Sequence, residues 1–344
     1  MRFIELFAGI GGFRYGLETV NEMELWRCRQ KENKLETNST NIISQSDKRQ
    51  FTYSCVYANE IDKYASQIYR KNFGGNELYE GDIRAITAKS IPDFDLITGG
   101  FPCQSFSIAG KRKGFGDTRG TLFFEICRIV EAKRPHLLLL ENVKGLLNHD
   151  SGNTFRIILD SLSELGYDCE WEVLNSKNFG VPQNRERVFI VGHLRGTSRG
   201  QIFPIGEDDT SINKENRGKS QLPTTISGTI TTRFGDRYQD TFIKQPATID
   251  LYHFLHGEKR PVTSRIMDDG NSATISSALP PSLINKNRIR RLTPTECERL
   301  QGFPDGWTKG ISDTQRYKCL GNAVTTNVIT EIGEKIRSVY VNTL

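Results

Sequence analysis

One cysteine of this chain stands where a nucleophile would. Cys103 follows the residues GGFP and precedes Gln104, and a basic segment hinged by glycines spans 110–120 soon after it. Pro102 fixes the backbone ahead of the cysteine, and nearby positive charge favours the thiolate, the nucleophilic form of the side chain. We therefore interpret Cys103 as a candidate nucleophile beneath a mobile cationic lid. The alternative is a buried cysteine that packs as a small hydrophobic residue.

Three further side chains could act beside that thiol. Glu141 ends the run HLLLLE, whose four leucines predict a central strand buried on both faces. A carboxyl group there can serve as an acid if burial raises its pKa; the alternative is an ion pair with a lysine such as Lys144. Arg185 and Arg187 follow in a polar turn and share one face if that segment is extended. Such a pair suits contact with a planar polar ring or a phosphate.

A glycine turn and two acids indicate a nucleotide-like ligand. The predicted strand 2–7 leads through AGIGG into a helix that starts at Phe13, which turns backbone N–H groups toward a ligand. Glu60 ends a second predicted strand, where an acid bonds ribose hydroxyls in nucleotide-binding folds; the alternative is a surface glutamate. Asp82 follows a third strand or turn, and it either bonds an adenine amino group or caps that turn.

Alternating strands and helices must position these residues. The pattern predicts an α/β fold with a mostly parallel, doubly wound sheet. Polar residues 27–51 are interpreted as a surface insertion with the composition of a disordered segment. The remaining elements predicted by periodicity are helices over 62–72, 121–133 and 154–165 and strands over 54–60, 94–98, 171–174 and 188–192.

The composition changes near residue 194. Residues 194–287 are rich in Gly, Thr, Ser, Asn and Pro, with short strands predicted within 229–238 and 272–276. We expect a smaller, irregular domain there. It would lie between a catalytic domain at 1–193 and a C-terminal segment at 288–344 that completes the catalytic domain.

The C-terminal segment carries a helix signature. Thr293 is placed as the N-cap, Pro294 as the first helical residue and Glu296 as the third, which together predict a capping box. Residues QGFPD from Gln301 stop this helix. A final amphipathic helix is predicted to end near Val339.

Bulk properties exclude several classes of protein. The 344 residues carry a net charge of +5 and contain neither an apolar run of membrane-spanning length nor a signal-peptide pattern. We therefore expect a cytoplasmic protein without a membrane partner. The seven cysteines form no C-x-x-C pair, which argues against a zinc site or a disulfide framework. His253 and His256 have no third ligand spaced with them, so no bound metal is predicted.

Together these segments resemble the DNA cytosine-5 methyltransferase family, most of all its compact bacterial restriction-modification members. The resemblance covers nearly the whole chain except 27–51 and 194–287. One motif of this kind would be weak, but eight occur here in the family's order. They are FAGIGG from Phe7, NE at Asn59, GD at Gly81, PCQ at Pro102, ENV at Glu141, QNRER at Gln183, RLTP at Arg291 through QGFP at Gln301, and GNAV at Gly321.

This resemblance implies a role for each candidate. Cys103 would attack C6 of a cytosine flipped out of duplex DNA, Glu141 would engage N3 and the exocyclic amine, and Arg185 would contact O2. Arg187 would support the same pocket. S-adenosylmethionine would supply the methyl group, without a metal. The residues implied to hold this donor are Phe7, Gly9, Gly11, Glu60, Ile61, Asp82, Ile83, Pro102, Leu122 and Asn322.

Recognition of the DNA sequence is expected to lie in 194–287, as a target-recognition domain. The family places a Thr and an aliphatic residue close to the flipped base. Thr274-Ile275 and Thr229-Ile230 both fit this pattern. We favour Thr274-Ile275, because its distance to RLTP suits the compact bacterial members.

Two arginines are predicted to read guanine. Arg233 and Arg237 flank Gly235, which lets their loop approach closely, and arginine pairs bidentately with guanine in the major groove. The alternative for both is a phosphate contact or a salt bridge with Asp236 or Asp240.

Double-stranded DNA is the expected partner of a monomeric enzyme. A cognate restriction endonuclease that acts on the same site is a second partner consistent with the resemblance. Two other functions compete. A tRNA cytosine-5 methyltransferase would share the motifs, but the size of 194–287 favours reading of a duplex. A catalytically silent DNA-binding regulator is disfavoured by the intact Cys103, Glu141 and Arg185.

Overall fold

The computed structural model describes the sheet and most of its helices. The described residues are 1–36, 51–102, 122–197, 200–205, 227–228, 230–231, 275–276, 282–285 and 288–341. The sequence candidates outside them are Cys103, 110–120, Thr229, Arg233, Asp236, Arg237, Asp240, His253, His256 and Thr274. Only the backbone of Ile275 is described. The division into domains at residues 194 and 288 stays a prediction.

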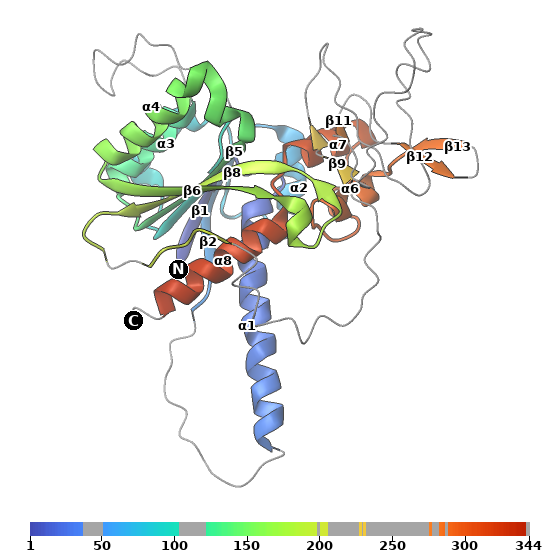
Figure 1. The fold of residues 1–344 in the computed structure, drawn as a ribbon, viewed down its shortest axis with the longest axis horizontal. Coiled ribbons are helices and arrows are strands. Elements are labelled where there is room, and N and C mark those ends of the chain that lie inside the picture. Colours follow the sequence, from blue (N-terminus) through green and yellow to red (C-terminus); the bar gives the residue numbers. More distant parts are fainter. Residues whose placement is uncertain are drawn as a thin grey trace.

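A seven-stranded sheet forms the centre of the described chain (Figure 1). Neighbouring strands from β3 through β5 are parallel, whereas β8 is antiparallel to both β5 and β6. The predicted mostly parallel, doubly wound α/β sheet is therefore confirmed. Its strands in spatial order are β3 (Leu78–Glu80), β2 (Ser54–Glu60), β1 (Arg2–Leu6), β4 (Leu96–Gly100), β5 (Leu137–Val143), β8 (Glu186–Leu194) and β6 (Tyr167–Asn175).

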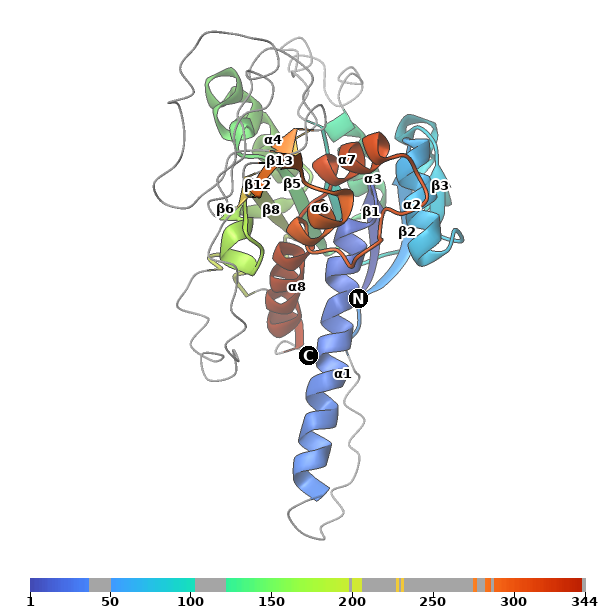
Figure 2. The same ribbon diagram turned by 90° about the vertical axis from the view of Figure 1, so that its right-hand side faces the viewer.

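Helices cover both faces of this sheet (Figures 1 and 2). The α-helices are α1 (Gly12–Glu36), α2 (Lys63–Phe73), α3 (Leu122–Lys133), α4 (Asn153–Glu164), α6 (Pro294–Leu300), α7 (Asp313–Asn322) and α8 (Thr326–Val341). None of the described helices is long and apolar enough to cross a membrane. Outside the large sheet, short strands pair as β7 (Gln183–Asn184) with β9 (Ser227–Gly228), β10 (Ile230–Thr231) with β11 (Ile275–Ser276), and β12 (Ser282–Asn285) with β13 (Arg288–Arg291).

The leucine run in β5 shows how the sequence builds this core. All four leucines are completely buried, because successive side chains of a strand face opposite sides of the sheet and both sides are covered. Leu137 and Leu139 pack in one cluster with residues of α1 and α8. Leu138 and Leu140 pack in a second cluster with residues of α3 and α4.

The first and last helices pack closely against each other. A Cβ added at Gly16 would lie 2.6 Å from the Cβ of Ile329, so only glycine permits this approach. Thr330 Oγ1 also donates a hydrogen bond of 3.0 Å to the carbonyl oxygen of Gly16, across 314 positions of sequence. Residues from opposite parts of the chain therefore complete one layer of the core.

Helix α1 differs from its expected length. It continues to Glu36, and its second half projects away from the sheet (Figure 2), so the interpretation of 27–36 as part of a disordered insertion is wrong. The segment is rich in Glu, Lys, Arg and Gln, which favour helix despite their polarity. Arg27 is also tied to α8 by an ion pair with Glu334 at 2.8 Å. Residues 37–50 lie outside the described chain.

Candidate active site

Several of the described candidates lie at one edge of the sheet. The chain runs outward through β2 and β3 and then returns to the other side of β1 as β4. In doubly wound sheets, ligands bind at the carboxyl ends of the strands, where the order of strands reverses in this way. The glycine turn follows β1, Glu60 ends β2, and Glu141 lies near the end of β5.

The turn after β1 requires an unusual backbone. Gly9 and Gly11 have φ of 55° and 84°, and Phe7 adopts a φ of 54°. A Cβ at Gly11 would lie 2.2 Å from a ring carbon of Phe73. Both this clash and the positive φ therefore exclude a side chain at Gly11. A non-glycine residue such as Phe7 in this region is uncommon and is typical of functional sites.

Glu60 holds this turn against the end of β2. Its Oε2 accepts a hydrogen bond of 2.7 Å from the Gly9 amide, and its Oε1 accepts bonds of 2.8 and 2.7 Å from the amides of Ile61 and Asp62. Burial raises the pKa of this carboxyl group, against the lowering effect of the three amides. The surface-glutamate alternative is wrong, since Glu60 is 8% exposed. Ile61, in contrast, is 65% exposed beside it.

A second acid, on strand β1, bonds the start of the helix that follows the turn. Glu5, on β1, is completely buried, and its Oε1 accepts bonds of 3.0 and 3.4 Å from the amides of Phe13 and Arg14 in the first turn of α1. Burial raises the pKa of Glu5 to about 8. Sequence analysis missed this residue, although an acid inside an otherwise apolar strand was a visible signal.

Asp82 serves as a helix cap in this structure. It accepts a bond of 2.9 Å from the Arg84 amide at the start of a short 3-10 helix, Ile83–Ala85. It also pairs with the Arg84 guanidinium, and that side-chain hydrogen bond lowers the pKa of Asp82 to about 2. The capping alternative thus describes the observed contact. Ile83 is buried beneath it.

The remaining donor-site candidates lie on one loop and two helices. Pro102 and Asn322 are exposed, and Leu122 at the start of α3 is half-buried. Asn322 ends α7, on the C-terminal segment. Within the described residues, no group of three or more His, Cys, Asp or Glu side chains could hold a metal ion.

Glu141 forms its ion pair with an arginine. Its Oε1 lies 2.9 Å from Nε of Arg187, and each side chain is 12% exposed. Lys144, the partner suggested by sequence, instead pairs with Glu186 at 2.9 Å. The reason is the antiparallel pairing of β5 with β8, which sets residue 143 opposite residue 187. Gly100 leaves room for the acid, since a Cβ there would lie 3.1 Å from Glu141 Oε2.

Arg185 is buried and linked to the C-terminal segment. Its Nη2 donates bonds of 2.8 Å to the carbonyl oxygen of Ala323 and 3.3 Å to that of Gly321. Burial lowers the pKa of this guanidinium, and the nearby charge of Arg187 lowers it further. Glu141 opposes that effect for both arginines. The carboxylate therefore pairs with Arg187 and also acts on the charge of the buried Arg185.

Asn142, beside Glu141, holds the backbone of Phe101, two residues before Cys103. This side chain is 4% exposed, and its Nδ2 donates a bond of 2.8 Å to the carbonyl oxygen of Phe101. Its Oδ1 accepts a bond from the Val143 amide at 2.9 Å. The Asn of ENV was visible in the sequence, but its partner 41 positions away was not.

A buried polar chain joins the C-terminal segment to the turn that carries Arg185. Ser176 Oγ lies 2.9 Å from Thr325 Oγ1, which donates a bond of 2.8 Å to Gln301 Oε1. Gln301 Nε2 in turn donates to the carbonyl oxygen of Leu320 at 2.7 Å. These residues were also missed, because each contact crosses a long stretch of sequence.

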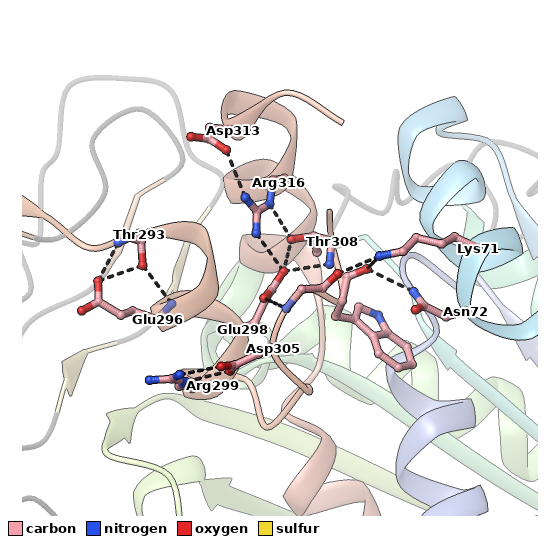
Figure 3. Close-up of polar contacts among 12 residues, drawn as sticks. Lys71, Asn72, Thr293, Glu296, Glu298, Arg299, Asp305, Thr308, Asp313 and Arg316 are labelled. Carbon is pink, nitrogen blue, oxygen red and sulfur yellow. Dashed lines mark hydrogen bonds and ion pairs between the residues drawn. The ribbon is translucent and has the colours of Figure 1, made fainter. Parts of the chain in front are cut away.

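Figure 3 shows the polar centre of the C-terminal segment. Thr293 and Glu296 form the predicted capping box of α6. Glu298 is completely buried and accepts bonds of 2.7 Å from the amides of Gly306 and Thr308, one bond from the Thr308 hydroxyl, and one of 3.1 Å from Arg316 Nη2. This carboxylate therefore fixes the loop that follows α6.

The comparisons with known proteins agree with this geometry. Residues 1–338 match the family model of C-5 cytosine-specific DNA methylase. The chain is 38% identical to the type II methyltransferase M.SsoII of Shigella sonnei over 347 residues, which cover 98% of this chain and 80% of that protein. Against M.HhaI of Haemophilus parahaemolyticus the identity is 35%, with 98% and 94% covered.

A solved structure supports the fold independently. The S. pombe Dnmt2 methyltransferase superposes with a TM-score of 0.60 at 20% identity, over 98% of this chain and 99% of that one. Such low identity establishes the fold alone. The family model and the bacterial relatives go further, since they span almost all of the sequence. The chain belongs to the C-5 cytosine-specific DNA methylase family.

Proposed function

We propose that this enzyme transfers a methyl group from S-adenosylmethionine to C5 of a flipped-out cytosine within a specific duplex sequence, as part of a restriction-modification system. One observation carries the proposal: the glycine turn held by Glu60 and the Glu141–Arg187 pair open on the same edge of the sheet. A donor on the turn would thus lie beside a base held by the pair. The bacterial relatives, named type II methyltransferases, support the restriction-modification role.

The chemistry assigns a distinct task to each residue. The Cys103 thiolate would add to C6 of cytosine while Glu141 binds N3, so that the electron pair released toward C5 makes this carbon a nucleophile. The bound donor supplies the methyl group that C5 takes. Loss of the C5 proton to a base, with expulsion of the thiolate from C6, restores the aromatic ring. Arg187 would hold Glu141 in place, and Arg185 would contact O2.

The donor site would use the residues named above. Glu60 and Asp82 have carboxylate oxygens at this edge for the ribose hydroxyls and the adenine amino group, and the exposed side chain of Ile61 offers an apolar surface to the adenine ring. Gly9 and Gly11 let the backbone approach the methionine portion. Asn322 would close the site from the C-terminal segment.

A covalent trap tests the mechanism. Purified enzyme is incubated with S-adenosylmethionine and duplex DNA whose target cytosine carries fluorine at C5, which blocks the final loss of the proton. We expect an adduct that survives denaturing electrophoresis, and no adduct with Cys103→Ser, because an alcohol is far less ionised than a thiol near neutral pH. Normal methylation by Cys103→Ser would refute the assignment. Methyl transfer to total tRNA, measured beside transfer to duplex DNA, tests the competing function of a tRNA methyltransferase.

Site recognition is assigned to 194–287, with Arg233 and Arg237 as base readers and Thr274-Ile275 close to the flipped base. Loss of a base reader should relax one position of the site at a cost of about 1–3 kcal/mol, whereas loss of a phosphate contact should weaken all sequences alike. Methylation of a randomised duplex library by Arg233→Ala and Arg237→Ala separates these outcomes. An unchanged sequence preference in both variants would exclude base reading.

A further inference from the structure

We propose that Asp62 and Lys318 form an ionic clasp that positions the two walls of the methyl-donor site, so that both are positioning residues for donor binding. The proposal rests on the proposed function for the identity of the ligand. Oδ2 of Asp62 lies 2.7 Å from Nζ of Lys318, and the two residues are separated by 256 positions. The hydrogen bond with Asp62 raises the pKa of Lys318.

The clasp joins segments that carry donor-site candidates. Asp62 directly follows Glu60 and the exposed Ile61, and its own amide donates to Glu60 Oε1 at 2.7 Å. Lys318 lies one helical turn before Asn322 on α7, and residues four apart share a helix face. A shift of α7 relative to α2 would therefore move Asn322 relative to Ile61.

Asp62 performs two tasks with separate oxygens. Its Oδ1 caps α2 by accepting bonds of 2.8 and 3.2 Å from the amides of Tyr64 and Ala65, while Oδ2 binds Lys318. Although burial raises the pKa of Asp62, the Lys318 and backbone hydrogen bonds lower it below its ordinary value. Asparagine is itself a good N-cap residue. Asp62→Asn can thus keep the cap and remove only the charge that faces Lys318.

Other contacts hold the same two segments together away from the donor site. Lys71 Nζ donates to the carbonyl oxygens of Gly306 and Trp307 at 2.7 and 3.1 Å, and Asn72 Nδ2 donates to that of Trp307 at 3.2 Å (Figure 3). Lys71→Met is therefore a matched control. It weakens the contact between α2 and the C-terminal segment without touching the clasp.

The test measures S-adenosylmethionine binding by calorimetry, with the melting temperature and kcat recorded for each variant. Both partners are partly exposed, with side-chain exposures of 27% and 43%, so the pair is in the weak class of about 0.2–1 kcal/mol. We expect Asp62→Asn and Lys318→Met each to weaken binding by about 1.4- to 5-fold. The kcat at saturating donor should stay at the wild-type value.

Three further results complete the design. The double variant should bind S-adenosylmethionine no more weakly than either single variant. Lys318→Arg, which keeps the charge, should bind it as wild type does. Lys71→Met should lower the melting temperature while donor binding stays at the wild-type level. Wild-type binding in Asp62→Asn and Lys318→Met, or equal weakening by Lys71→Met, would overturn the clasp. Failure of the wild-type chain to bind S-adenosylmethionine would instead overturn the proposed function.

Discussion

The hydrogen bond from Asn142 to Phe101 is expected to affect catalysis much more than donor binding. Asn142→Ala removes the Nδ2 group that donates to the Phe101 carbonyl oxygen at 2.8 Å. Phe101 is 3% exposed, so this oxygen would be left in a buried setting. Phe101 is two residues before Cys103, and release of its carbonyl would free the backbone just ahead of the nucleophile.

The size of the effect follows from the buried oxygen. An unsatisfied buried acceptor costs about 1–3 kcal/mol. If this cost destabilises the conformation in which Cys103 reacts, kcat decreases by about 5- to 150-fold, since each 1.36 kcal/mol corresponds to a factor of ten. The dissociation constant for S-adenosylmethionine should change much less than kcat, because Pro102 is the donor-site candidate that adjoins Phe101, whereas Glu60 holds the glycine turn through its own bond to the Gly9 amide.

Single-turnover methylation at saturating donor and duplex DNA measures this effect directly. Asn59→Ala is the matched control, because Asn59 is 2% exposed and donates to the Gly81 carbonyl oxygen at 2.8 Å, far from Phe101 in sequence. We expect a similar loss of stability in both variants and a loss of turnover only in Asn142→Ala. A turnover rate within twofold of wild type in Asn142→Ala would refute the reasoning.

Two further predictions concern stability. Glu298→Gln should lower the free energy of unfolding in urea by about 3–5 kcal/mol, because it leaves Arg316 without its buried counter-ion. Asp313→Asn, which alters the exposed partner of the same arginine, should cost less than about 1 kcal/mol, and equal effects would contradict this ranking. For Glu5, a folded-state pKa of about 8 means that the folded chain retains a proton which the unfolded chain releases, so stability should fall as the pH rises from about 5 to 8. Glu5→Gln should flatten that decline in urea titrations, and a pH dependence equal to wild type would disprove the role of Glu5.

Local signals in the sequence predicted much of this structure. The capping box of Thr293 and Glu296 uses residues three apart, and the leucines of β5 form a continuous apolar run, so both were visible without tertiary information. Helix α7 was not predicted, because it is mostly polar and buries only Cys319, Leu320 and Gly321.

The contacts of the site depend on pairing between distant segments. Position at a strand end suggested Glu60, but its bond to the Gly9 amide depends on how β1 and β2 pair. Likewise, the spacing of Arg185 and Arg187 gave no sign that Arg185 bonds the Ala323 carbonyl 138 positions later. Sequence therefore identified which residue types gather at this edge, and tertiary structure determined their partners.

The close packing of α1 against α8 has a consequence for synthesis in the cell. Gly16 begins to be buried only when Ile329 and Thr330 arrive, 313 and 314 positions later. At about 5–20 residues per second, translation of the intervening chain takes at least about 15 seconds. Throughout this time the part of α1 that packs against α8 has no permanent cover, and contacts so distant in sequence form slowly. A nascent chain would thus be unable to complete its core, and we expect chaperones to engage it until α8 leaves the ribosome.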